Sequence, residues 1–201
     1  MSSSHILLMG QVHASAQPCV ISTVLGSCVA VCLWDAGAAV GGMNHFMLPH
    51  WNGQGLPRPR FGNIAVPALV EAVLALGARR GALVAKVFGG GHVFARGEMP
   101  AMLNVGHRNA EYALAALERE GIAVVAQRLK PAHGIKVAFD TGSGEVLLRR
   151  LSRLSPSSPR SPRSPQSRPD AVNFDARASI PHEPASSRCA SSVRCPALDG
   201  A

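Results

Sequence analysis

Aromatic and charged residues are both scarce in this chain of 201 residues, where they make up 4% and 16% of the composition. So little charge argues against a coiled coil and against a highly charged disordered chain. Hydrophobic residues make up 47%, which suffices for a sizeable core built from Ala, Val, Leu and Gly. The composition therefore predicts one globular domain followed by a tail.

Charge is almost absent from the first 57 residues, where Asp35 is the only Asp, Glu, Lys or Arg. Polar residues, glycine and proline still interrupt every apolar run, and none reaches the roughly 18 apolar residues of a membrane-spanning helix. A buried sheet explains the missing charge, and we do not expect membrane insertion. The N-terminus also lacks the basic residues of a signal peptide, so we expect a cytoplasmic protein.

The 20 basic residues form no dense block, although they exceed the 12 acidic residues and give a net charge of +8. Nucleic-acid binding usually needs clustered cations together with stacking aromatic side chains. The sequence therefore does not favour a nucleic-acid partner.

The five cysteines are an odd number at irregular spacing, which favours free thiols in a reducing compartment over a disulfide framework. Only Cys28 and Cys32 have the spacing of zinc ligands, and no second ligand pair accompanies them. We therefore expect no metal site.

The composition changes abruptly after Leu154. From Ser155 onward the chain reads SPSSPRSPRSPQSRPD, a proline-rich pattern that favours extended polyproline II and cannot bury a core. We therefore divide the chain into a globular domain, residues 1–154, and a disordered tail rich in Ser, Pro and Arg, residues 155–201.

Within the globular domain, runs rich in Val, Ile and Leu predict strands, and two segments predict helices. The helices are expected at Ile64–Leu76, with Asn63 as its N-cap and Gly77 after its end, and at about His107–Glu120. The strands are expected at Cys19–Thr23, Cys28–Trp34, Ala39–Leu48, Leu83–Phe88, Ala123–Leu129, Ile135–Phe139 and Glu145–Arg150. Because strands cluster before and after the helices, we predict an α+β fold with mixed sheets.

The most informative segment for chemistry contains Cys28, which directly follows Gly26 and Ser27 at the start of an apolar strand. A tight turn there can expose the thiol beside free backbone N–H groups, as in a nucleophile with an oxyanion hole. The alternative is that Cys28 is a small buried hydrophobic residue. Cys32, deeper in the same strand, fits that alternative well.

His45 lies in the strand expected after the hairpin signal at Asp35–Gly37. Two antiparallel strands joined by a short turn can bring Cys28 and His45 into hydrogen-bond reach, where the imidazole would lower the thiol pKa and act as a general base. The alternative is a buried core histidine. Ser22 and Thr23 are both candidates to orient the imidazole, and strand alternation lets only one of them face it.

A glycine run, Gly89–Gly91, follows the strand expected at Leu83–Phe88. The run lacks the spaced glycines and the Gly-Lys-Ser/Thr of a phosphate loop. We therefore expect it to form a close backbone turn beside the candidate site.

Five segments together resemble the CheD family of chemoreceptor glutamine deamidases. They are TVLGSCVAVCLWD (23–35), GGMNHFMLP (41–49), AKVFGGG (85–91), NVGHRN (104–109) and GIKVAFDTGSGEV (134–146), in the family's order. The resemblance covers about residues 5–150. It implies a layered α/β sandwich of mixed sheets with flanking helices, similar to the catalytic domain of deamidating bacterial toxins.

The resemblance implies that Cys28 is the nucleophile, that His45 is the general base and acid, and that a hydroxyl residue is the third member. The family usually has Thr at the position of Ser22, six residues before the cysteine, so Ser22 is carried over with Thr23 as its rival. The chain departs from the family at Pro131–Gly134, where a glycine-rich and more basic stretch is usual.

The reaction that the resemblance implies is cysteine-dependent deamidation of receptor glutamines to glutamate, the activity of a protein-glutamine glutaminase. The turn at Gly26 and Ser27 would hold the oxyanion, and no metal or organic cofactor is required. Hydrolysis of glutamyl methyl esters is chemically close. Expected partners are the cytoplasmic helices of chemoreceptors and a CheC-type phosphatase. A non-catalytic chemotaxis module that binds such a phosphatase or a receptor is the alternative.

Overall fold

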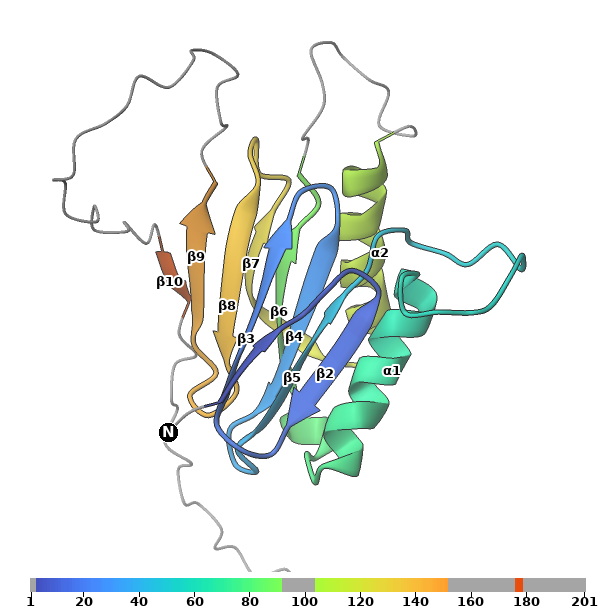
Figure 1. Ribbon diagram of the computed structural model, residues 1–201. Coiled ribbons are helices and arrows are strands. Elements are labelled where there is room, and N and C mark those ends of the chain that lie inside the picture. Colours follow the sequence, from blue (N-terminus) through green and yellow to red (C-terminus); the bar gives the residue numbers. More distant parts are fainter. Residues whose placement is uncertain (1–2, 92–103, 152–175, 179–201) are drawn as a thin grey trace, which may run out of the picture.

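The computed structural model describes residues 3–91, 104–151 and 176–178, which form three layers (Figure 1). Two helices pack on one face of a five-stranded sheet, and a second five-stranded sheet packs on its other face. The first sheet is called the middle sheet and the second the outer sheet. The predicted α+β fold with mixed sheets is confirmed.

The middle sheet has the strand order β2-β5-β4-β6-β7. Its strands are β2 (Gln11–Ser15), β4 (Val29–Asp35), β5 (Val40–His45), β6 (Val84–Gly89) and β7 (Ala123–Leu129). β6 and β7 run parallel and the other neighbours are antiparallel. β4 and β5 form the predicted hairpin, so the strands that carry Cys28 and His45 at their ends are direct neighbours.

The outer sheet has the strand order β1-β3-β8-β9-β10. Its strands are β1 (Ser3–Ile6), β3 (Cys19–Leu25), β8 (Ile135–Asp140), β9 (Val146–Arg150) and β10 (Ala176–Ala178). β1 and β3 run parallel, and the remaining pairs are antiparallel.

β4 is buried along its whole length, because it is a central strand with a layer on each face. Val31 and Leu33 belong to the core under the helices, whereas Cys32 and Trp34 belong to the core between the two sheets. A strand covered on both faces reads as a continuous apolar run. This burial accounts for the absence of Glu, Lys and Arg from β4.

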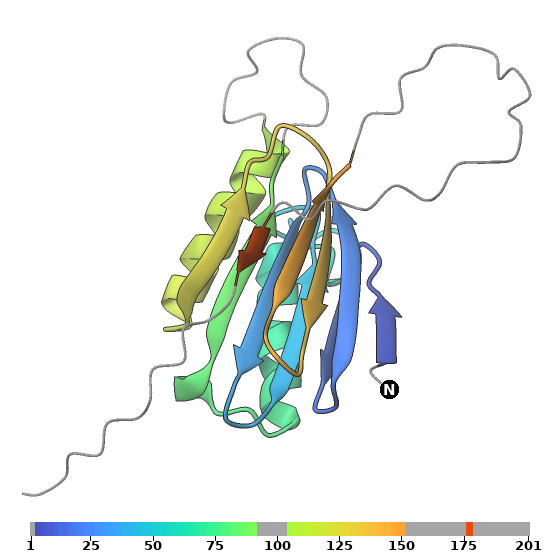
Figure 2. The same cartoon turned by 90° about the vertical axis from the view of Figure 1, so that its left-hand side faces the viewer.

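The two α-helices are α1 (Gly62–Ala75) and α2 (Val105–Arg119), and a short 3-10 helix spans Arg80–Ala82. Each α-helix ends as expected before a glycine with positive φ, Gly77 at 100° and Gly121 at 68°. Figure 2 shows β1 at one side of the molecule and α2 at the other. The helices therefore cover only the face of the middle sheet that points away from the outer sheet.

The start of α1 differs from the prediction. Its N-cap residue is Phe61, which makes no side-chain cap, and the predicted cap Asn63 lies inside the first turn. The Asn63 Oδ1 instead accepts a hydrogen bond from the Trp51 N–H at 2.8 Å. A tertiary contact with the preceding loop thus replaces the local capping role that the sequence suggested.

β1, β2 and β10 were not expected from the sequence. β1 and β2 are edge strands with mostly exposed or half-buried residues, so they lack the apolar alternation that marks a strand. β10 pairs antiparallel with β9 and lies within the segment 155–201, which was expected to be a disordered tail. The rest of that segment lies outside the described residues.

Within the described ranges, no helix is long and apolar enough to cross a membrane. The three cysteines of these ranges, Cys19, Cys28 and Cys32, are free thiols, as expected. Cys189 and Cys195 lie outside them.

Candidate active site

The turn between β3 and β4 crosses from the outer sheet to the middle sheet, and the glycine run holds it in place. The Gly91 N–H donates to the Gly26 carbonyl and the Gly90 N–H to the Cys28 carbonyl, both at 2.8 Å. Gly89 has φ 107°, and a Cβ atom there would collide with the Cys28 carbonyl oxygen. The expected close backbone turn beside the site is therefore present.

Asn109 of α2 connects the two chain segments that carry the candidate residues. Its fully buried side chain donates from Nδ2 to the Ser27 carbonyl at 3.0 Å and to the Met47 carbonyl at 2.7 Å. Ser27 precedes Cys28, and Met47 follows His45 by two residues. One amide group thus couples the backbone next to the thiol with the backbone next to the imidazole.

Sequence reasoning did not identify Asn109 as a site residue. It stands in the segment NVGHRN, which contributed only to the family resemblance. Its position on the buried face of a helix could have drawn attention, because a buried amide needs hydrogen-bond partners. The identity of those partners depends on the tertiary packing.

The bound carbonyl groups set the direction of the N–H groups in the turn. A trans peptide group points its N–H opposite to its C=O, and the described residues contain no cis peptide bond. The Ser27 N–H therefore points away from Gly91, and the Cys28 N–H points away from Asn109. Both N–H groups are directed away from the elements that hold the turn.

The strand register makes Cys28 and His45 diagonal neighbours on one face of the middle sheet. Val29 pairs with Phe46 in antiparallel fashion, so His45 lies opposite Ala30, two residues beyond Cys28. Cys28 packs against the core between the sheets, which is the face that His45 also uses. Side chains on a diagonal of this kind are within reach of one another when one of them is long.

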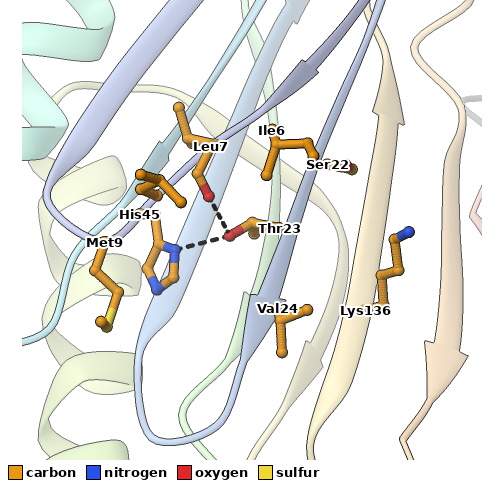
Figure 3. Close-up of a pocket in the computed structure, with 9 residues that line it drawn as sticks. Ile6, Leu7, Met9, Ser22, Thr23, Val24, His45 and Lys136 are labelled. Atoms are coloured by element: carbon orange, nitrogen blue, oxygen red, sulfur yellow. Dashed lines mark hydrogen bonds between the residues drawn. The ribbon is translucent and has the colours of Figure 1, made fainter.

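Thr23 reaches His45 from the opposite layer (Figure 3). Its hydroxyl oxygen lies 2.8 Å from the His45 Nδ1, and it donates a hydrogen bond to the Leu7 carbonyl at 2.8 Å. A hydroxyl has one hydrogen to donate, so the contact with the imidazole must be Nδ1–H donating to Thr23. The neutral imidazole then carries no hydrogen on Nε2, which is buried and has no hydrogen-bond partner among the described residues.

Ser22 lies on the other face of β3 and does not meet His45. Residues of β3 alternate between buried and less buried positions, with Thr23 buried and Ser22 half-buried. Figure 3 shows the Ser22 side chain directed away from the imidazole. Of the two hydroxyls considered from the sequence, the structure thus brings Thr23 to His45, because a shift of one residue along a strand reverses the face.

Burial keeps both members of the candidate pair neutral. It lowers the pKa of His45 from 6.5 to about 4, although the Leu7 carbonyl opposes this change. It also raises the pKa of the Cys28 thiol above 9.0, opposed by the Cys28 N–H. The thiol pKa thus moves in the direction opposite to the expected one, because loss of water around the sulfur outweighs any gain from a neutral imidazole.

Cys32 is a matched neighbour of Cys28, because it lies four residues further along β4 and faces the same core. It is buried, and burial raises the pKa of its thiol far more strongly than that of Cys28. This environment fits the inert hydrophobic role expected for Cys32.

A largely apolar cavity of about 650 Å³ opens onto the His45 and Thr23 pair (Figure 3). Its lining residues are Ile6, Leu7, Leu8, Met9, Ser22, Thr23, Val24, His45 and Lys136. Most of them come from β3 and from the segment that links β1 to β2. In the parts of the chain that the structure describes, no group of three or more His, Cys, Asp or Glu side chains could hold a metal ion.

The fold is an α+β sandwich in which the Thr23 hydroxyl contacts His45, and Cys28 with its backbone turn lies diagonally across the sheet from His45. Residues 47–150 match the family model described as CheD chemotactic sensory transduction. That match begins after His45, so the candidate residues rest on the geometry described above.

Curated relatives extend the similarity over most of the chain. A probable chemoreceptor glutamine deamidase CheD of Trichlorobacter lovleyi is 51% identical over 146 residues, which cover 73% of this chain and 89% of the relative. A protein of the same name in Sulfurimonas denitrificans is 43% identical, covering 69% of this chain and 88% of the relative. A probable chemoreceptor glutamine deamidase CheD 1 of Anaeromyxobacter dehalogenans is 48% identical, covering 71% of this chain and 81% of the relative. The chain belongs to the CheD family.

Proposed function

We propose that this protein deamidates specific glutamine side chains of chemoreceptors to glutamate, with Cys28 as the nucleophile. The observation that carries the proposal is the tautomer of His45, because the Thr23 contact assigns hydrogen to Nδ1 and leaves Nε2 as a base. The names of the curated relatives supply the substrate class.

In the first step, the Cys28 sulfur attacks the carboxamide carbon of the glutamine while the thiol proton moves to the His45 Nε2. The carbonyl oxygen becomes an oxyanion, which the N–H groups of Ser27 and Cys28 stabilise, with Gly26 allowing the turn. The carbon–nitrogen bond then breaks, His45 returns the proton to the leaving nitrogen, and ammonia departs. A thioester remains on Cys28.

In the second step, water attacks the thioester carbon and gives a proton to His45. The carbon–sulfur bond breaks, and the proton returns to the sulfur. The products are glutamate and the original thiol, so the cycle consumes one water and releases one ammonia. A glutamyl methyl ester would react by the same two steps, with methanol in place of ammonia.

In this mechanism the thiol proton of Cys28 moves to His45 while the sulfur attacks the carboxamide carbon. The raised pKa of Cys28 and the lowered pKa of His45 favour a neutral thiol and a neutral imidazole in the resting enzyme. With a pKa of about 4, His45 is unprotonated across the neutral range, so its Nε2 has a free lone pair. No metal or organic cofactor takes part in these steps.

The protein substrate would be the cytoplasmic helices of chemoreceptors, in keeping with a cytoplasmic enzyme that does not insert into the membrane. A CheC-type phosphatase is a further proposed partner. Each deamidation adds one negative charge to the receptor, which would tune chemotaxis signalling.

Mass spectrometry of a purified receptor cytoplasmic fragment tests the proposal. The wild type should add about one mass unit for each modified glutamine, as replacement of the amide by an acid requires. Cys28→Ala should abolish the change. Cys32→Ala, the matched control on the same strand face, should retain it.

Equal deamidation by the wild type and by Cys28→Ala would exclude Cys28 as the nucleophile. No mass change with the well-folded wild type on several receptors would favour the non-catalytic module. In that case the protein should still bind a receptor or a CheC-type phosphatase.

A further inference from the structure

Four exposed apolar side chains surround the mouth of the cavity beside His45. They are Ile6, Leu8, Met9 and Val24, with exposed fractions of 73%, 61%, 60% and 53%. We call them the apolar lip. Single exposed apolar residues are common, but a group of four around one cavity marks a contact site for another molecule.

The backbone under the lip is tied to the candidate active site. The Gly10 N–H donates to the His45 carbonyl at 2.7 Å, and Gln11 bonds Leu8 through both its N–H and its side-chain Oε1. The Leu7 carbonyl, next to Leu8, accepts from Thr23. The lip is therefore presented at a defined position relative to the imidazole.

A basic row continues from the lip across the outer sheet. Val24 pairs with Lys136 on β8, and Lys136 pairs with Arg149 on β9, so the three side chains share one face. Lys136 is exposed and also lines the cavity. In the described part of β8, the carboxylate on this face is Asp140, four residues away at the other end of the strand. This end of the outer face is thus positively charged.

We propose that the apolar lip and the Lys136–Arg149 row bind the segment of the protein substrate that carries the target glutamine. The occupant is an amphipathic segment with apolar side chains next to the glutamine and carboxylates further along it. The inference rests on the proposed function, because the same cavity contains the lip and the pair of His45 and Thr23. Apolar contacts supply most of the affinity, and the basic row adds attraction that depends on salt.

The double variant Leu8→Ser/Met9→Ser tests the lip. Loss of two apolar contacts should raise KM for the receptor fragment about tenfold while changing kcat much less. The matched control is Val125→Ser on β7, which is 41% exposed and lies at the opposite edge of the middle sheet from β2. Thermal unfolding checks whether the double variant keeps its fold. The rate of Cys28 alkylation checks whether the site around the thiol is unchanged.

The double variant Lys136→Gln/Arg149→Gln tests the basic row. KM should rise at low salt, and its increase with ionic strength should be weaker than in the wild type. A KM that changes less than about twofold in both double variants would overturn the docking proposal. The same would follow if Val125→Ser raised KM as much as the lip variant.

Binding separates this inference from the proposed function. Calorimetric titration of Cys28→Ala with the receptor fragment reports docking without turnover, and the lip variant in that background should bind about tenfold more weakly. Binding that depends on the lip, without deamidation by the wild type, would support docking and contradict the proposed function. Deamidation by the wild type, with an unchanged KM in the lip variant, would support the proposed function and contradict docking at the lip.

A second copy of this chain is the other candidate occupant. Sedimentation velocity of the wild type and of the lip variant distinguishes it. A wild-type dimer that the lip variant converts to a monomer, with an unchanged KM, would assign the lip to self-association and overturn the proposal.

Discussion

Polar side chains lie at both ends of β4, with Cys28 and His45 at one end and Asp35 at the other. The two groups differ in their charge and in their hydrogen-bond partners. At one end Cys28 and His45 are neutral, and the His45 Nε2 has no partner among the described residues. At the other end Asp35 is ionised and completely surrounded by donors. The difference is the one expected between the proposed reactive site and a site that stabilises the fold.

The Asp35 carboxylate closes the hairpin between β4 and β5. Its Oδ1 accepts from the Gly37 and Ala38 N–H groups, and its Oδ2 accepts from the Arg79 N–H, at 2.9 to 3.1 Å. The Arg79 Nε adds an ion pair at 3.5 Å. Burial alone would raise the pKa of Asp35, but these donors lower it below its usual value. The buried charge is thus fully compensated.

The site at the other end leaves two buried acceptors without a hydrogen-bond partner among the described residues, the Asn109 Oδ1 and the His45 Nε2. An unpaired buried polar atom costs stability, so such atoms are rare unless they have a use. Of these two atoms, the His45 Nε2 is the nitrogen that the proposed reaction needs as a base. We therefore expect changes at the Asp35 end to alter stability and changes at the His45 end to alter chemistry.

The largest effect is expected for Asp35→Asn. The amide removes the charge and sets an NH₂ group or a weaker acceptor against three N–H donors, so the free energy of unfolding should fall by about 3 kcal/mol. Urea unfolding measures this loss. The kcat of the folded fraction should stay the same, and a large fall in kcat at an unchanged stability would contradict the division between the two ends.

The next effect concerns Thr23. Thr23→Val keeps the shape and removes the hydroxyl, so kcat should fall about 10- to 100-fold as the imidazole loses its orientation. Thr23→Ser should restore most of the activity. Ser22→Ala, on the outer face of β3, should change kcat less than about twofold, and a larger loss there than in Thr23→Val would reverse the assignment.

A smaller effect is expected for Asn109→Ala, which releases the Ser27 and Met47 carbonyls. Loss of alignment between the two candidate residues should lower kcat about tenfold with little change in KM. The variant will also be less stable, so Val70→Ala, a cavity at a buried position of α1, provides a control with a comparable stability loss. If kcat falls equally in both variants, Asn109 has only a structural role.

The smallest effect is the pH dependence of stability. His45 has a folded pKa of about 4 against an ordinary value of 6.5, so the unfolded chain binds its proton first as pH falls. The contribution of the neutral His45 side chain to the free energy of unfolding is complete above pH 6.5 and is lost progressively as the pH falls to about 4. Asp35, whose pKa is lowered, contributes above its ordinary value of 3.8 and loses this contribution only in stronger acid.

Urea unfolding at pH 7 and pH 5 separates the two groups. His45→Gln should reduce the difference in stability between these pH values, whereas Asp35→Asn should leave it unchanged. The opposite pattern would show that the imidazole is not held neutral by burial.

Much of the fold followed from local patterns. The strands β3 to β9 and both α-helices lie close to their expected positions, because all of them except β7 bury apolar residues at regular spacing. The edge strands β1 and β2 could not be predicted, because their pairing depends on β3 and β5 rather than on their own alternation. The prediction that Asn63 caps α1 was wrong for a similar reason, since the Asn63 side chain binds the Trp51 N–H in the preceding loop.

The candidate site divides in a similar way. The Gly-Ser-Cys turn, the histidine after the hairpin and the glycine run could be singled out by residue type and spacing. The choice between Ser22 and Thr23, and the part played by Asn109, could not, because each depends on a residue in another layer.

The sequence by itself determined the fold class and the family, and it singled out Cys28 and His45 as candidates for the proposed reaction. Only the tertiary structure decided which hydroxyl meets the imidazole, which carbonyls Asn109 binds and in which direction burial shifts the pKa values. Residue type specifies the functional groups that are present. Their protonation and orientation depend on the water excluded and the partners supplied by segments far apart in the chain.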